Sequence, residues 1–298
     1  MNHGIIGHGR IRRFLRTIAE GKELPHHSFL FTGPEHIGKS LVAREFSALL
    51  LGVSPEDTDT DPDFRILRPE RTSEDVEKDI PVDAVRDAVR FLSRFPSGAS
   101  RRVLLVEEAH RMTDGAQNAL LKTFEEPNDT SVLLLVTSRP GAVRETLRSR
   151  SFQVSFTLVP EAELLEGVGI EGTGAEAKTD RFFVSLGRPG IVFGSRFDPE
   201  TFAQRRDTLR KLFRLSELTF SERIALAESL SSYPVSETLL LLEWWVSIRR
   251  TAERNRTDPD RIRATYRLLE EIEETARLLR TTNANTRIAL DRLFLSVE

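Results

Sequence analysis

Short apolar runs alternate with amphipathic helical stretches through the first 157 residues. The runs that predict buried strands are Ser28–Thr32, Val103–Val106 and Val132–Val136, with a shorter run at Ile66–Leu67 and an alternating one at Phe152–Phe156. Between these runs, apolar residues recur at helical spacing. Strands that alternate with helices favour a parallel sheet covered by helices on both faces, so this part of the chain is predicted to be α/β.

Three helices are predicted between these strands. One follows the glycine-bearing turn at residues 33–40, one covers Pro81–Phe95 and one covers Asp114–Phe124. The segment Ser54–Asp63 is acidic and rich in turn-forming residues, so we expect a surface loop there.

The pattern changes after Pro160, where the apolar runs stop. Residues 166–178 predict a loop or a weak helix, and residues 182–193 are interrupted by Gly187–Arg188–Pro189–Gly190. Helical periodicity then predicts five helices, over residues 199–214, 221–231, 235–254, 259–280 and 285–297. The expected fold class is α/β followed by all-α, with domains over 1–157, 158–198 and 199–298.

Composition narrows the class of protein. The chain has 298 residues and a net charge of −3, which argues against a surface coated with basic residues but leaves room for a local basic patch. The absence of cysteine excludes disulfides, cysteine nucleophiles and cysteine-ligated zinc. No apolar stretch approaches the length of a transmembrane helix, and the first residues lack the apolar core of a signal peptide, so we expect a cytoplasmic protein.

The strongest motif is a phosphate-binding loop. The run Gly33–Pro34–Glu35–His36–Ile37–Gly38–Lys39–Ser40 fits the pattern G-x-x-x-x-G-K-[ST], between a predicted strand and a predicted helix. Glycines let the backbone curl so that N–H groups face phosphate oxygens, and the helix adds its positive N-terminus. Lys39 is expected to reach the β- and γ-phosphates of ATP or ADP, and Ser40 to ligate Mg²⁺. The alternative is a glycine turn beside an ordinary surface lysine.

Two acids follow the predicted strand at Val103–Val106. In nucleotide hydrolases with such a loop, the first acid holds the Mg²⁺ shell and the second orients or deprotonates the attacking water. Here Glu107 and Glu108 occupy these places, and Glu107 stands where aspartate is usual. Because Mg²⁺ tolerates little departure from octahedral geometry, the extra methylene is expected to weaken hydrolysis more than binding. The alternative is a solvated pair of acids at a strand end.

Several motifs in order resemble the clamp-loader branch of the AAA+ ATPases. They are Ile6–Gly7–His8, His27–Pro34, Asn118–Pro127, Val136–Ser138 at the sensor-1 position, Leu147–Ser151 in place of an S-R-C run, Gly187–Gly190 and Asn283–Asn285. The resemblance spans nearly the whole chain and is most specific over residues 27–40 and 103–151. The Gly187–Gly190 run is similar to the lid of delta-prime-type subunits.

The resemblance implies a place in a bacterial replication complex. Such subunits form a heteropentamer with gamma/tau-type motor subunits and a delta-type subunit, which places the sliding clamp on primer-template DNA. It implies an AAA+ nucleotide-binding domain over 1–157, a helical lid over 158–198 and an oligomerisation collar over 199–298. Arg150 is then expected to act in trans as an arginine finger on the neighbour's ATP, with Glu108 and Thr137 as further catalytic positions.

Departures from the family pattern shape the functional expectation. The four-cysteine zinc module of many relatives is absent, so no zinc site is expected. The lid lacks the G-S-x-R-D-A-like run that carries the motor subunits' arginine, which makes a response to ATP in cis doubtful. We therefore expect a stator that binds nucleotide and hydrolyses it weakly or not at all. The alternative is an ATP-hydrolysing gamma/tau-type motor or another AAA+ ATPase.

Other polar and aromatic residues leave several interpretations open. Arg101, Arg102 and Arg111 could face DNA phosphates, or they could belong to the domain's own surface. His36 and His110 are expected to be positional rather than metal ligands. For Trp244 and Trp245, we expect one to pack in the core and the other to be buried at a subunit interface.

Overall fold

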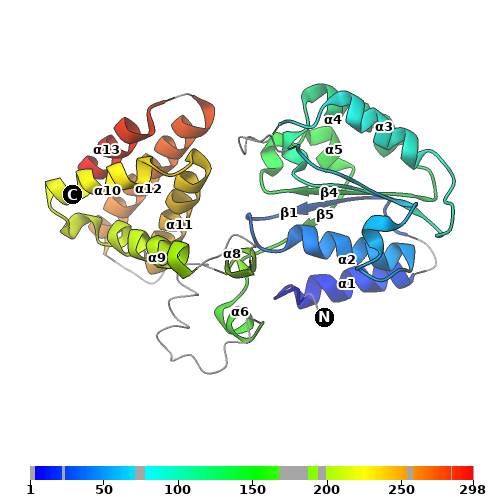
Figure 1. The fold of residues 1–298 in the computed structure, drawn as a ribbon, viewed down its shortest axis with the longest axis horizontal. Helices are drawn as coiled ribbons and strands as arrows, with labels where there is room; N and C mark the ends of the chain where they lie inside the picture. Colours follow the sequence, from blue (N-terminus) through cyan, green and yellow to red (C-terminus); the bar gives the residue numbers. More distant parts are fainter. Residues whose placement is uncertain are drawn as a thin grey trace. The chain divides into compact units, whose positions relative to one another are not determined.

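The computed structural model describes residues 4–21, 24–70, 78–167, 187–193, 199–253, 258–282 and 284–297, which form two compact units (Figure 1). The first unit contains the described residues up to Gly167 together with Gly187–Val192, and the second contains those from Phe193 onward. None of the helices in these ranges is long and apolar enough to cross a membrane. The three-domain division remains a prediction.

The first unit is built on a five-stranded sheet. Its strands are β1 (Ser28–Thr32), β2 (Phe64–Leu67), β3 (Arg102–Val106), β4 (Ser131–Thr137) and β5 (Phe152–Ser155), in the order β2-β3-β4-β1-β5. Every neighbouring pair is parallel, which confirms the predicted α/β fold. Thr32 lies opposite Thr137, so the loops that follow β1 and β4 leave the same edge of the sheet. In open parallel sheets this carboxyl edge is where ligands bind.

Helices cover both faces of this sheet. Those that contribute to the two cores at the sheet are α1 (Gly9–Glu20), α2 (Lys39–Leu51), α3 (Val82–Leu92), α4 (Asp114–Glu125) and α5 (Glu145–Ser149). The chain also forms α6 (Glu161–Gly167), α8 (Pro189–Phe193) and the 3₁₀ turns η1 (Thr58–Thr60), η2 (Ala109–Arg111) and η3 (Pro140–Ala142). Phe29 and Phe31 of β1 belong to the core that contains α1 and α2, whereas Leu30 belongs to the core that contains α3, α4 and α5. This alternation follows from the two-residue period of a strand, and it gives the sheet a buried apolar layer on each side.

The structure corrects three local expectations. Helix α1 was not predicted, although Leu15 and Ile18 form its buried stripe. Helix α3 ends at Leu92 rather than at Phe95, because a residue that precedes a proline disfavours helical backbone and Pro96 follows. The segment Ser54–Asp63 is not wholly a surface loop, since Asp63 is fully buried.

The second unit is helical, as predicted. It contains α9 (Pro199–Phe213), η4 (Leu215–Glu217), α10 (Phe220–Ser231), α11 (Val235–Glu253), α12 (Pro259–Thr281) and α13 (Thr286–Ser296). Thr219 and Glu222 form a capping box at the start of α10, and the Asn285 side chain accepts a hydrogen bond from the Ile288 N–H at the start of α13. These caps satisfy N–H groups that have no partner inside the helix, so they fix where both helices begin.

Trp244 and Trp245 are both buried inside the second unit, with exposed fractions of 0% and 1%. The Trp245 ring packs edge-on against Phe294 of α13, with ring centroids 6.0 Å apart. The expectation that one of the two is buried at a subunit interface is therefore wrong. Helix α11, which carries both rings, packs against α9 and α12 of the same unit.

Candidate nucleotide site

The phosphate loop connects β1 to α2 through three residues with positive φ. Gly33, His36 and Gly38 have φ angles of 144°, 61° and 94°. A Cβ on Gly33 would lie 2.5 Å from the Phe156 carbonyl oxygen, so only glycine fits there. A Cβ on Gly38 would meet no atom within 4 Å, which shows that open space borders the backbone immediately before α2. A curled loop with open space at a helix N-terminus fits a phosphate group.

Lys39 is the first residue of α2 and lies under this loop. Its Nζ donates hydrogen bonds to the carbonyl oxygens of Gly33, at 2.8 Å, and Pro34. The side chain is buried, and this burial is the main reason that the pKa of Lys39 falls to about 8. The positive charge of Arg188 lowers this pKa further, while Glu35 and Glu108 act to raise it. Lys39 is therefore a partly desolvated cation held by the phosphate loop itself.

Glu35 links the phosphate loop to the end of β4. The Ser138 hydroxyl donates a hydrogen bond to Glu35 Oε1 at 2.9 Å. Desolvation opposes ionisation of Glu35, but the hydrogen bond from Ser138 and the charges of His36, Arg139 and Lys39 lower its pKa. The residue is thus an ionised group at neutral pH that joins two loops on the carboxyl edge of the sheet.

Thr137, for which the sequence predicts the sensor-1 position, is buried at the end of β4. Its Oγ1 accepts a hydrogen bond from the Arg139 N–H at 3.0 Å and lies 3.1 Å from Nδ1 of His110. Burial, followed by the nearby charge of Arg139, lowers the pKa of His110 to about 4. His110 is therefore a neutral ring that holds Thr137, in line with the positional role expected for it. The catalytic role of Thr137 stays a prediction.

The two acids after β3 have different surroundings. Glu107 Oε1 lies 3.7 Å from Arg44 Nε, and Arg44 also donates two hydrogen bonds to Asp59. Glu108 has a φ of 50°, and its charge acts on Lys39. Within the described part of the chain, no group of three or more His, Asp or Glu residues could hold a metal ion. The role of Ser40 and Glu107 as Mg²⁺ ligands beside a bound nucleotide stays a prediction.

Arg150 follows α5 and contacts neighbours outside the phosphate loop. Its Nη1 donates to the Thr146 carbonyl oxygen at 3.3 Å, and its Nη2 lies 3.4 Å from Glu125 Oε1. The side chain is 43% exposed. A residue that acts on a neighbouring subunit needs such exposure, so this placement is compatible with the predicted role in trans.

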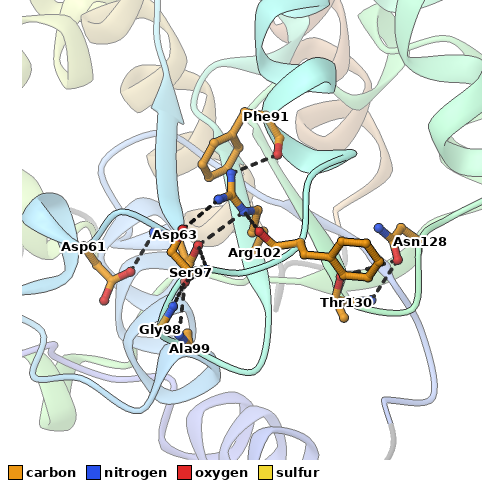
Figure 2. Close-up of polar contacts among 10 residues, drawn as sticks. Asp61, Asp63, Phe91, Ser97, Gly98, Ala99, Arg102, Asn128 and Thr130 are labelled. Carbon is orange, nitrogen blue, oxygen red and sulfur yellow. Dashed lines mark hydrogen bonds and ion pairs between the residues drawn. The ribbon is translucent and has the colours of Figure 1, made fainter.

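The sequence patterns do not predict the buried polar cluster around Asp63 (Figure 2). The Asp63 carboxylate accepts hydrogen bonds from the backbone N–H groups of Ser97, Gly98 and Ala99 and lies 3.2 Å from Arg102 Nε. Although burial opposes ionisation, these bonds and the charge of Arg102 lower the pKa of Asp63. The cluster fixes the loop before β3 to the residue before β2.

Arg102 is 7% exposed, so the hypothesis that it faces DNA is wrong. Its guanidinium donates to the carbonyl oxygens of Phe91 and Phe95 and lies over the Phe91 ring (Figure 2). The signal that could have found this pair is the strand register. Phe64 lies opposite Val103, which places the preceding residues, Asp63 and Arg102, opposite each other as well. Sequence alone does not give that register.

Comparison with known proteins agrees with this architecture. A sequence model of the family described as "DNA polymerase III, delta subunit" matches residues 7–160. The chain is 31% identical over 245 residues to DNA polymerase III subunit delta' of Pseudomonas aeruginosa, which covers 76% of this chain and 71% of that protein. It is 29% identical over 199 residues to the Escherichia coli subunit delta', which covers 62% of this chain and 58% of that protein.

A solved structure shares the fold. The DNA polymerase III gamma subunit-related protein from Thermotoga maritima aligns with a TM-score of 0.53 at 21% identity, over 95% of this chain and 97% of that one. At this identity the likeness concerns the fold alone. The family model and the two delta' relatives agree with the parallel sheet and the phosphate loop. The chain therefore belongs to the DNA polymerase III delta-prime family.

Proposed function

We propose that the chain is a delta-prime-type subunit of a bacterial sliding-clamp loader. In this role it binds ATP or ADP at the phosphate loop, hydrolyses it weakly or not at all, and donates Arg150 to the nucleotide of a neighbouring motor subunit. The observation that carries the proposal is the difference in exposure between two side chains. The Arg150 side chain is 43% exposed after α5, whereas that of Glu107, which would hold Mg²⁺, is 17% exposed and lies 3.7 Å from Arg44.

Nucleotide binding is supported by the loop geometry. Lys39, the backbone N–H groups of the loop and the N-terminus of α2 would hold the phosphates, and Ser40 and Glu107 would hold the Mg²⁺ that accompanies them. When bound, the metal supplies charge neutralisation to the phosphates. Lys39 must leave the carbonyl oxygens of Gly33 and Pro34 to reach a phosphate, so binding requires this side chain to turn.

Weak hydrolysis in cis is supported by the surroundings of Glu107. A carboxylate that faces Arg44 shares its charge with a cation, and its longer side chain moves the oxygens relative to an aspartate. Both effects weaken the ability of the Glu107 carboxylate to bind Mg²⁺ and its water ligands. The partners proposed on family grounds are gamma/tau-type motor subunits, a delta-type subunit, the sliding clamp and primer-template DNA.

The test is ATP binding and turnover by the isolated chain. We expect the wild-type protein to bind ATP in the presence of Mg²⁺ without steady turnover, and Lys39→Ala to lose binding because it removes the cation that faces the phosphates. Steady turnover that Lys39→Ala abolishes would replace the stator with the motor alternative. If the wild-type chain binds no nucleotide, the nucleotide part of the proposal is wrong.

A further inference from the structure

The segment Gly187–Gly190 is held at both of its ends by backbone hydrogen bonds to other parts of the first unit. The Gly187 carbonyl accepts a hydrogen bond from the Val159 N–H at 2.8 Å, and the Gly190 N–H donates to the His36 carbonyl of the phosphate loop at 2.8 Å. A Cβ on Gly187 would lie 2.5 Å from the Val159 carbonyl oxygen, and one on Gly190 would lie 2.8 Å from that of His36. These close approaches need glycine, so the segment has a defined position on the phosphate loop.

Arg188 lies between the two anchors and is buried, with 6% of the residue exposed. The Gly190 N–H, two residues later, donates to the His36 carbonyl oxygen, so the backbone that carries Arg188 lies against the phosphate loop, and the charge of Arg188 acts on Lys39 of that loop. Two cationic side chains are therefore gathered at the phosphate loop. One comes from the first residue of α2, and the other comes from a segment about 150 positions later in the chain.

This arrangement has an electrostatic cost when no anion is bound. Buried cations lose hydration, and two like charges repel, while the N-terminus of α2 adds further positive potential. Glu35 and Glu108 offset part of this charge at Lys39. A polyphosphate would neutralise both cations, and the planar fork of a guanidinium matches two phosphate oxygens at once.

We propose that Arg188 is a polyphosphate-binding residue that acts in cis beside Lys39. This inference rests on the nucleotide binding proposed above. It revises the expectation that a lid without the G-S-x-R-D-A arginine gives no response in cis, because Arg188 reaches the same loop from a different position in the lid segment.

The experiment is isothermal titration of the full chain, in the presence of Mg²⁺, with ATP and separately with pyrophosphate. Arg188→Gln is expected to lower the affinity for both by about 10- to 100-fold, the range for hydrogen bonds to a charged group. Arg188→Lys, which keeps the charge without the fork, is expected to lose less. Arg94→Gln, at an exposed arginine of the same unit, serves as the matched control and is expected to change neither affinity.

The outcomes separate this inference from the proposed function. If folded Arg188→Gln binds ATP and pyrophosphate like the wild type while Lys39→Ala loses both, Arg188 has no such role and nucleotide binding stands. If the wild type binds no ATP, the nucleotide proposal is wrong, and pyrophosphate decides the role of Arg188 by itself. The inference is overturned if Arg188→Gln binds pyrophosphate with the wild-type affinity, or if the wild-type chain binds neither ATP nor pyrophosphate. Circular dichroism checks the fold, and if Arg188→Gln does not fold, unchanged affinity in Arg188→Lys overturns it.

Discussion

Nζ of Lys39 donates a hydrogen bond to the carbonyl oxygen of Gly33 at 2.8 Å, so the lysine of the phosphate loop is bound by the loop that precedes it. Its pKa is lowered to about 8, first by burial and then by the charge of Arg188. The cation is therefore held in a place where it loses part of its hydration. A bound phosphate would relieve this cost and raise the pKa again.

This relationship predicts how nucleotide affinity depends on pH. Below pH 8 Lys39 is charged in the free protein and meets the phosphate without a proton change. Above pH 8 it is neutral in the free protein and must take up a proton on binding. The affinity for ATP should then fall as pH rises from 8 toward 10, by up to about tenfold per pH unit. Titrations at pH 7, 8 and 9 measure this.

Proton uptake gives a second measurement of the same effect. At pH 9 nearly one proton should be taken up per ATP bound. The binding enthalpies measured in two buffers should then differ by nearly the full difference between the ionisation enthalpies of those buffers. At pH 7 the contribution of Lys39 to this difference should vanish. An affinity that is constant from pH 7 to 9, with no dependence on the buffer at pH 9, would contradict the lowered pKa.

The same pKa also predicts the stability of the free protein. The folded pKa of Lys39 lies below the ordinary value of 10.5, so the unfolded chain binds more protons between pH 8 and 10.5. Lys39 then destabilises the folded state fully below pH 8, and this penalty is relieved as pH rises above 8. The unfolding free energy of the wild type, measured relative to that of Lys39→Met, should therefore be higher at pH 10 than at pH 7. Denaturant unfolding at the two pH values tests this, and an unchanged difference would contradict it.

Arg150→Ala should affect the assembled loader and leave the isolated chain unchanged. Its contacts with Thr146 and Glu125 are solvent-accessible, so their loss should cost less than about 1 kcal/mol of unfolding free energy. An arginine finger contributes about 10³- to 10⁵-fold to the rate at the site it serves. With the motor subunits, clamp and primed DNA, we expect DNA-stimulated ATP hydrolysis at that site and clamp loading to be lost.

The matched control for Arg150 is Arg94→Ala, which removes an exposed arginine from the same unit. The control should retain wild-type hydrolysis and loading when it is reconstituted in the same way. If Arg150→Ala assembles normally and also keeps wild-type rates, the role in trans is wrong.

The sequence predicts the features that depend on local pattern. The runs Ser28–Thr32 and Val103–Val106 predict strands because apolar runs bounded by turns are a local signal, and the strands observed there are Ser28–Thr32 and Arg102–Val106. The phosphate loop is predicted because its spacing is specific. Features that depend on register or on distant contacts were not found. The pairing of Asp63 with Arg102 follows from which strands are neighbours, and the burial of Arg188 follows from a contact between segments about 150 residues apart.

The two tryptophans show the limit of composition as a guide. An apolar helix in a predicted oligomer suggests an interface, but the decision between core and interface depends on how many helices surround it. Here α9, α12 and other helices of the unit enclose both rings. Trp245→Ala should therefore destabilise the chain by about 3–5 kcal/mol, the range for removal of a buried aromatic side chain. Denaturant unfolding measures this, and a change below about 1 kcal/mol would show that the ring is not part of the core.

Asp63 offers the sharpest test of the first unit. Its carboxylate is fully buried and satisfies three backbone N–H groups as well as Arg102 (Figure 2). Asp63→Ala leaves these donors and the cation without their partner, so unfolding free energy should fall by about 3–5 kcal/mol, the range for breaking a buried ion pair. Asp63→Asn keeps an acceptor oxygen and should fall by less. Exposed Asp83 in α3, changed to Ala, is the matched control and should stay within about 0.5 kcal/mol of the wild type.

The pH dependence of this group has a definite sign. Because the folded pKa of Asp63 lies below its unfolded value, its ionised form stabilises the protein above the unfolded pKa of 3.8, and this contribution is lost as pH falls toward the folded pKa. The difference in unfolding free energy between wild type and Asp63→Asn should therefore be constant from pH 7 to 5 and shrink below pH 4. A difference that stays constant down to pH 3 would show that the carboxylate charge does not hold the loop before β3, and that packing alone does.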